Sequence, residues 1–370
     1  MDNSFKIPFY AKMAFIFISV FAVVYTMRIG QHIIIPLLYT TIIAILLNPF
    51  INYLIRHKIK KLLAISIAVI LAVLVTIGIL YVVASQITMV SETYPQLIDK
   101  ANIISTRLVH WISIRFKIRE YKINTWITTT QNEMITSFSI GEKLTEVGQM
   151  ILGGMLLPVY LFLILYYKPL LLEFIRKLFK SEHHIAVVDV LINSKQVIQN
   201  YLIGLFFEMI IIAILNSVGL LLLNIQYAIF LGITGAILNI IPYFGGIVAT
   251  ALPMIIAFVT KDSSTSSILV FFVYVIIQLV DNHYIIPHIV VSRVKINALI
   301  SVIVVLIGDA VWGIPGMFLS IPLTAIVKVI FDHIEPLKPW GFLLGNIVPT
   351  TSPKFSFIKP KRIPINHIEK

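Results

Sequence analysis

The chain has 370 residues, of which 58% are hydrophobic and only 12% are charged, and its mean hydropathy is +0.95. Soluble globular proteins carry about 25% charged residues, so this composition excludes that class and predicts an integral membrane protein. The net charge of +12 would suit a nucleic-acid-binding protein, but the basic residues form short clusters beside apolar runs, which is the positive-inside pattern.

The apolar runs are long, rich in Leu and Ile, and lack the alternation of an outer-membrane barrel, so we expect α-helices. The first two runs, residues 11–27 and 32–47, form a hairpin of spans, and we interpret the first as retained and not as a cleaved signal peptide. The basic cluster at 56–61 follows. We expect this short loop and the N-terminus in the cytoplasm, with residues 62–83 crossing outward.

Residues 84–150 differ from their surroundings, because acidic and basic residues are mixed and apolar residues recur at helical spacing. No run in this stretch is long enough to span a bilayer, so we expect an amphipathic helical region outside the membrane. Its basic residues do not contradict this side, since long loops cross membranes largely regardless of charge.

Residues 151–167 are expected to return to the cytoplasm, where Lys168 and Lys180 follow. The adjacent pair His183 and His184 suggests a metal site, but neighbouring histidines on a helix point to different faces and no third ligand is near. We therefore predict neither a metal site nor a cofactor.

Two further apolar stretches are each interrupted by glycine and proline, residues 227–260 at positions 239–246 and residues 298–330 at positions 308–316. Backbone freed from helical bonding is tolerated at membrane depth only where it is buried in protein or lines a watery cavity. Paired broken helices of this kind are typical of the binding sites of secondary transporters.

The arms of both broken segments have roughly 10–15 residues, or about 15–22 Å of helix, against about 30 Å of hydrocarbon. They are therefore either re-entrant hairpins or pairs of short tilted spans. Full spans at 206–223 and 268–286 precede the two broken segments. The predicted fold is an all-α polytopic bundle of about six full spans plus two broken hairpins, about eight transmembrane segments in all, with a possible inverted repeat.

Three carboxylates, on Glu208, Asp281 and Asp309, fall within apolar runs. Each costs about 2.5–3.5 kcal/mol at a helix centre, so each needs a reason to be there. Proton or sodium binding is one such reason, and amide side chains accompany the carboxylates at Asn216, Asn239, Gln278 and Asn282. The alternative is that Asp281 and Asn282 lie at the membrane interface and that Asn239 and Asp309 cap helices. The candidate residues for substrate or ion binding and for gating are Glu208, Asn239, Pro242, Phe244, Gly245, Gly246, Gln278, Asp281, Asn282, Asp309, Gly313, Pro315, Gly316 and Pro322.

Two membrane aspartates also raise the hypothesis of intramembrane aspartyl proteolysis. That chemistry usually uses a Gly-x-Gly-Asp sequence, whereas Leu306 here takes the place of the first glycine before Gly308 and Asp309. Motifs for metal-dependent, serine-dependent or ATP-driven chemistry are absent from the sequence. We therefore expect a protein that is not an enzyme.

The order and spacing of these residues resemble those of the autoinducer-2 exporter (AI-2E) family of bacterial membrane proteins. The resemblance implies export or exchange of small solutes, since both transport of the quorum-sensing furanone and sodium/proton exchange occur among its members. The residues that carry it are Asn239, Pro242, Tyr243, Phe244, Gly245, Gln278, Asp281, Asn282, Pro287, Gly308, Gly313, Gly316, Ile321 and Pro322.

The sequence thus predicts a secondary transporter in the bacterial cytoplasmic membrane, with both termini inside, a homo-oligomeric state, a small molecule or ion as substrate and no nucleic-acid partner. Asp281 is the expected coupling residue. The alternatives are a sodium/proton antiporter and a structural protein of the cell envelope. The expected divisions are an N-terminal membrane part (1–83), an amphipathic region (84–150), a transport domain (151–335) and a cytoplasmic tail (336–370).

Overall fold

The computed structural model describes residues 8–116, 140–242, 244–261, 265–291 and 296–346. Within these ranges the chain forms helices and no strand, and seven of the helices are long and apolar enough to cross a membrane. Three shorter apolar helices accompany them. The predicted class, an all-α polytopic membrane protein, is confirmed.

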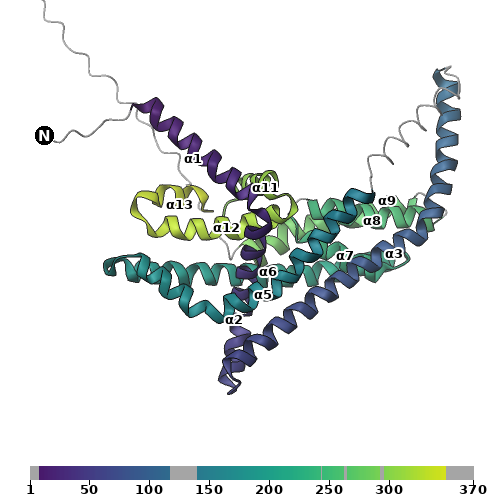
Figure 1. The fold of residues 1–370 in the computed structure, drawn as a ribbon. Helices are drawn as coiled ribbons and strands as arrows, with labels where there is room; N and C mark the ends of the chain where they lie inside the picture. Colours follow the sequence, from purple (N-terminus) through teal and green to yellow (C-terminus); the bar gives the residue numbers. More distant parts are fainter. Residues whose placement is uncertain (1–7, 117–139, 243, 262–264, 292–295, 347–370) are drawn as a thin grey trace, which may run out of the picture.

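The N-terminal part consists of α1 (Phe9–Ile29), α2 (Gln31–Arg56), α3 (Lys61–Phe116) and α5 (Ile140–Leu178). Helix α1 projects away from the other helices and has no buried residue, although its side chains are almost all apolar (Figure 1). A helix that is apolar on every side and unpacked in the protein faces lipid. Helices α2, α3 and α5 instead pack together through a buried apolar cluster that includes Ile51, Ile65 and Leu161.

Helix α3 continues without a break through residue 83, where hydropathy predicts the end of a span, to Phe116. Its 56 residues correspond to roughly 84 Å, far more than a bilayer's hydrocarbon thickness, so its distal part extends beyond the membrane. The helical character predicted for 84–150 is therefore present at 84–116 and again at 140–150. The predictions for 117–139 and for the tail beyond residue 346 lie outside the described residues.

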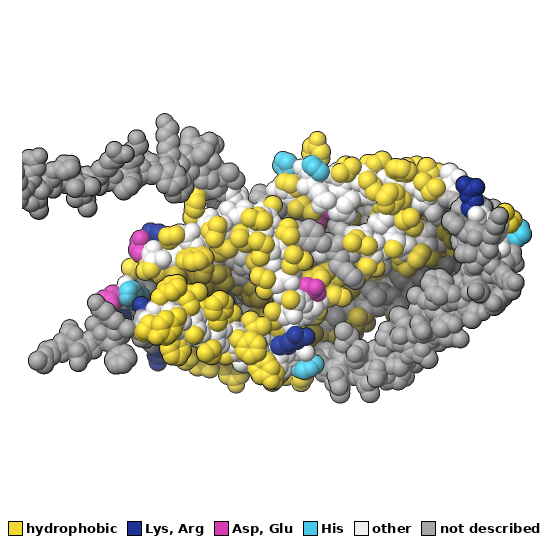
Figure 2. All heavy atoms as spheres, turned by 90° about the horizontal axis from the view of Figure 1, so that it is seen from above, with side chains coloured by type: hydrophobic (Ala, Val, Ile, Leu, Met, Phe, Trp, Pro, Cys, Tyr) yellow, Lys and Arg dark blue, Asp and Glu magenta, His cyan; other side chains and the backbone are white. Residues whose placement is uncertain are grey.

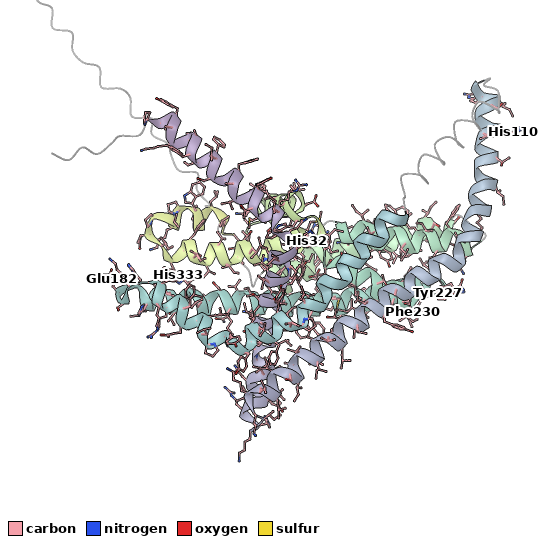
Figure 3. The ribbon with its side chains drawn as sticks, viewed as in Figure 1. His32, His110, Glu182, Tyr227, Phe230 and His333 are labelled. Carbon is pink, nitrogen blue, oxygen red and sulfur yellow. The ribbon has the colours of Figure 1, made fainter. Side chains whose placement is uncertain are left out.

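The distal part of α3 packs against the C-terminal half of the chain (Figure 1). Figure 3 shows Tyr227 and Phe230, at the start of α7, beside α3, with His110 farther along that helix. The ammonium of Lys100 donates hydrogen bonds to the carbonyl oxygens of Phe258 at 3.0 Å and Lys261 at 2.7 Å. The long helix is thus tied to the end of the first broken segment.

The C-terminal half contains a long helix followed by two shorter arms, and this order occurs twice. Its elements are η1 (Ser181–His183), α6 (His184–Leu222), α7 (Ala228–Asn239), α8 (Phe244–Thr260), α9 (Thr265–Val280), the π-helix η2 (Asp281–Val291), α11 (Ala298–Trp312), α12 (Ile314–His333), η3 (Glu335–Leu337) and α13 (Lys338–Leu344).

Both breaks lie where glycine and proline predicted them, the first between α7 and α8 and the second between α11 and α12. One arm differs from expectation, because α12 has 20 residues and is long enough to span, which accounts for a seventh long helix beside the six predicted. Pro315 lies in the first turn of α12, which begins at Ile314. Backbone N–H groups in the first turn have no partner within the helix, so a proline, which lacks this group, is tolerated there.

The outer surface fits a bilayer environment. Figure 2 shows hydrophobic side chains over most of the visible face, with the charged groups in a few separate spots. Large apolar side chains on α3, α5 and α9 are exposed in the same way. Exposed apolar surface on this scale excludes a water-soluble monomer and is what lipid contact requires.

Candidate functional site

The first break is a close crossing of two helix ends. Helix α7 ends at Asn239, and the backbone amide of Gly245 donates to the carbonyl oxygen of Ile241 at 2.9 Å as α8 begins. A Cβ atom on Gly245 would overlap the carbonyl of Leu238 and lie 2.8 Å from Cα of Asn239. Only glycine permits this approach.

Across this break, Asn239 contacts the buried carboxylate of Asp281. The side-chain amide of Asn239 donates a hydrogen bond of 3.0 Å to Oδ2 of Asp281, which is completely buried and begins the π-helix η2. The other oxygen, Oδ1, is also buried and has no hydrogen-bond partner among the described residues. A buried acceptor without a partner costs about 1–3 kcal/mol, so this oxygen would be stabilised by a proton, a cation or a water molecule.

Gln278 lies at the same place, one helical turn before Asp281. A Cβ atom on Gly246 would lie 2.9 Å from Oε1 of Gln278 and 3.6 Å from Oδ1 of Asn239. The start of α8, the end of α7 and the end of α9 therefore meet around polar oxygens. Asn282, by contrast, is exposed and lies outside this cluster.

Helix α6 contributes Glu208 and Asn216 from its buried face, two turns apart with Ile212 between them. Glu208 is 5% exposed and lies within electrostatic range of Asp281. Neither carboxylate forms an ion pair with a Lys or Arg in the described part of the chain. Two buried acidic groups near each other, without a compensating cation, form a site that attracts protons or metal cations.

A small cavity of about 10 Å³, with room for about one water molecule, is lined in part by Asn239, the residue that bonds to Asp281. Two of its lining atoms, Oδ1 of Asn216 and the hydroxyl of Tyr274, are buried and lack hydrogen-bond partners in the part of the chain that is described. The cavity is lined by Ile212, Asn216, Gly235, Asn239, Ala249, Tyr274, Ile277 and Gln278.

Sequence reasoning missed Tyr274 and Gly235, which line the cavity, and the buried Thr234, one position before Gly235. Tyr274 lies one turn before Gln278 on the same helix, and that i, i+4 spacing was the available signal. Thr234 is buried, and its hydroxyl likewise has no hydrogen-bond partner among the described residues. A Cβ atom on Gly235 would lie 3.2 Å from Nδ2 of Asn216 and 3.4 Å from the Tyr274 hydroxyl, so this glycine keeps the cavity open.

The second break is built by glycine packing. Gly313 has φ +62°, which favours glycine, and separates α11 from α12. A Cβ atom on Gly308 would overlap the carbonyl of Gly316, and a Cβ atom on Gly316 would overlap the carbonyl of Gly308. The two arms are therefore in backbone contact.

This second break lies against the N-terminal helices. The indole N–H of Trp312 donates to the carbonyl oxygen of Met27 at 2.9 Å, and the hydroxyl of Tyr39 donates to that of Pro315 at 3.4 Å. The side chain of Asp309 is exposed, and no contact joins it to Asp281 in the described residues. Most of the predicted site residues thus fall into two groups, one around Asn239 and Asp281 and one at the second break, whereas Asn282 belongs to neither.

The remaining predicted residues support the two breaks. Pro242 is partly buried in the turn between α7 and α8, and Pro322 is fully buried within α12. Pro315 is partly buried at the start of α12. The side chain of Phe244 and the whole of Arg293 lie outside the described residues.

Residues 14–335 match the model of the AI-2E family transporter. YueF of Bacillus subtilis (strain 168), named as a candidate transport protein, is 25% identical over 82% of this chain and 84% of its own length. The AI-2 transport protein TqsA of Escherichia coli (strain K12) is 23% identical over 86% of this chain and 91% of its own. The chain therefore belongs to the AI-2E family of transporters.

Proposed function

We propose that this protein is a secondary transporter that exports or exchanges a small solute across the bacterial cytoplasmic membrane, by ion coupling or by facilitated movement. The observation that carries the proposal is the buried Asp281, bonded through one oxygen to Asn239 at a helix break and left with its other oxygen unpaired among the described residues. The relative TqsA is named for AI-2 transport, so AI-2 is the first solute to test.

The Asn239–Asp281 hydrogen bond provides a physical means of coupling. It connects the end of α7 to the start of η2, so it holds the first break in one arrangement. A cation on the free oxygen of Asp281 would draw negative charge from the oxygen that accepts from Asn239. The hydrogen bond that holds this arrangement would therefore be weaker when the cation is bound. A ligand shifts a conformational equilibrium only when it interacts differently with the two conformations, and this weakening would provide the difference.

A sodium/proton antiporter is the second candidate, and the position of Glu208 favours it. This buried carboxylate lies within electrostatic range of Asp281. Like charges in a medium of low dielectric constant repel strongly, so binding of a cation would relieve the repulsion between the two carboxylates. A proton and a sodium ion would then compete for the pair, and each would displace the other. Gln278 and Asn216 line the cavity together with Asn239, and amide oxygens of this kind are suitable sodium ligands.

We further propose that both termini and the loop at 56–61 are cytoplasmic, together with Lys180 and Arg293, while 84–150 and Lys261 lie outside. Residues 151–335 form the transport domain, and residues 1–150 provide a scaffold and a homo-oligomer contact. The apolar helix α1 supports such a contact, because none of its residues is buried and a second copy would cover it as well as lipid does.

The test is flux into proteoliposomes with imposed proton or sodium gradients, using AI-2 and the cations themselves as substrates. The comparison is between the native protein, Asp281→Asn, and the matched control Asp189→Asn, which changes an exposed carboxylate on the same helix as Glu208. We expect the control to transport normally and Asp281→Asn to lose gradient-driven flux. Absence of any flux from the native protein under either gradient would reject the proposal.

A further inference from the structure

Three lysines lie on α3, α5 and α6, helices that each pack against α2. Lys168 on α5 is half-buried and lies within electrostatic range of both Lys195 on α6 and Lys61 at the start of α3. This basic cluster, Lys61, Lys168 and Lys195, comes from three separate helices. Folding therefore brings like charges together, which has an electrostatic cost.

Neutral groups hold two of these ammonium groups in place. Lys168 donates a hydrogen bond of 2.5 Å to Oδ1 of Asn48, which is 7% exposed. Lys61 donates to the carbonyl oxygen of Tyr166 at 3.3 Å and lies 5.5 Å from the centre of that residue's ring. The cations are thus fixed by a buried amide and by an aromatic face, neither of which carries a negative charge.

No carboxylate in the described part of the chain forms an ion pair with the basic cluster. The acidic residue nearest to Lys168 on its own helix, Glu173, is already bonded to Arg176 at 2.7 and 2.9 Å. The acidic residue nearest to Lys195 on α6, Asp189, is exposed and six positions away. The positive charge is consequently left for an anion from outside the chain.

The surroundings indicate what kind of anion this is. Lys61 is the first residue of an apolar span and is followed by the exposed Leu62 and Leu63, and the exposed Leu170 lies two positions after Lys168. Tyr166 and Tyr167 pack edge to face at 5.0 Å just before Lys168, and tyrosines are enriched at the level of lipid headgroups. A ligand that fits has a negative head and long apolar chains.

We propose that the basic cluster binds the phosphate of an anionic phospholipid headgroup, with the acyl chains lying on the adjacent leucines. Basic pockets between transmembrane helices recognise such headgroups through charge. In the topology proposed above, this lipid belongs to the cytoplasmic leaflet. It would neutralise the cluster and fasten α3, α5 and α6 to one another, and α6 carries Glu208.

The experiment measures binding of phosphatidylglycerol and phosphatidylcholine to the full-length protein in detergent by native mass spectrometry. The test variant is Lys168→Gln with Lys195→Gln, and the matched control is Lys177→Gln with Lys180→Gln, which removes two exposed lysines next to the same helices. Each lysine near an anionic headgroup typically strengthens binding about 5-fold, so losing two should weaken phosphatidylglycerol binding about 30-fold. The control should bind like the native protein.

Any one of three results would overturn the proposal. The first is equal weakening of phosphatidylglycerol binding in both double variants, and the second is no preference of the native protein for phosphatidylglycerol over phosphatidylcholine. The third is binding of glycerol phosphate as tight as that of phosphatidylglycerol, which would indicate a site for a free anion. If the test variant does not fold, the exposed Lys61→Gln replaces it, with an expected loss of about 5-fold. Lys168→Arg keeps the charge and should retain binding, so its failure to do so would also contradict the proposal.

Discussion

Asn239 donates a hydrogen bond of 3.0 Å to Asp281 across 42 positions of sequence, joining the first helix break to the π-helix. Interhelical hydrogen bonds in membrane proteins contribute about 0.6 kcal/mol on average, but a bond to a carboxylate contributes about 1.5–3 kcal/mol. We expect Asn239→Ala and Asp281→Asn to be coupled by about 1–2 kcal/mol in a double-mutant cycle of unfolding free energies. The control pair, Asn239→Ala with the exposed Asn282→Ala, should be additive within about 0.5 kcal/mol.

The glycines at the breaks should not tolerate a methyl group. A Cβ atom at Gly245 or Gly316 overlaps a backbone carbonyl, so Gly245→Ala and Gly316→Ala should each cost about 1–3 kcal/mol of stability and reduce transport strongly. A methyl group added at Gly78 would meet nothing within 4 Å, so Gly78→Ala should be neutral or stabilise by up to about 1 kcal/mol. Thermal unfolding in detergent and flux assays provide the comparison; full transport by the break variants would contradict a gating role.

The contact of Lys100 with the end of α8 should stabilise the first broken segment. Lys100→Met removes a cation from two carbonyl oxygens at the C-terminal end of a helix, a position where positive charge is favourable. We expect faster hydrogen exchange of amides at 257–261 and a loss of about 0.5–2 kcal/mol in local stability. Lys100→Arg keeps the charge and should restore protection, and unchanged exchange in Lys100→Met would show that the contact contributes nothing.

The proposed topology can be tested because the chain contains no cysteine. Single substitutions Lys58→Cys, Lys180→Cys and Lys261→Cys place one thiol in each of three loops. An impermeant maleimide added to intact cells should label only Lys261→Cys, because the proposed topology places the short basic loops in the cytoplasm. Labelling of all three after membrane permeabilisation is the control, and labelling of Lys58→Cys in intact cells would reverse the assignment.

The breaks were predictable from sequence because their causes are local. Proline and glycine interrupt helices wherever they stand, and the observed ends at Asn239 and Gly313 fall within the predicted segments. The pairing of Asn239 with Asp281 was not predictable, since it depends on how α7 and η2 pack. Tyr274 was missed because a tyrosine within an apolar run is more often a packing residue than a site residue.

The sequence also did not indicate how far the long helices extend. Hydropathy ends the third span near residue 83, yet α3 continues to Phe116 because amphipathic periodicity supports a helix as well as a uniformly apolar run does. Asp281 and Asp309 both lie in apolar stretches, and in sequence Asp281 is favoured as the coupling residue only by its neighbours Gln278 and Asn282. Packing separates the two far more clearly, since Asp281 is completely buried and Asp309 is exposed.

That difference gives the sharpest prediction about the site. Asp309 lies in the last turn of α11, which ends at Trp312, and its side chain is exposed. Its backbone carbonyl accepts a hydrogen bond of 2.7 Å from the amide of Gly313. Asp309→Asn preserves that bond, and exposed substitutions usually change free energies by less than about 0.5 kcal/mol, so gradient-driven flux should stay within about twofold of the native rate. Asp281→Asn, which alters the buried carboxylate, should abolish the response to the gradient. Measured side by side in proteoliposomes, equal losses in the two variants would mean that both breaks bind the coupling ion and that Asp281 is not its single site.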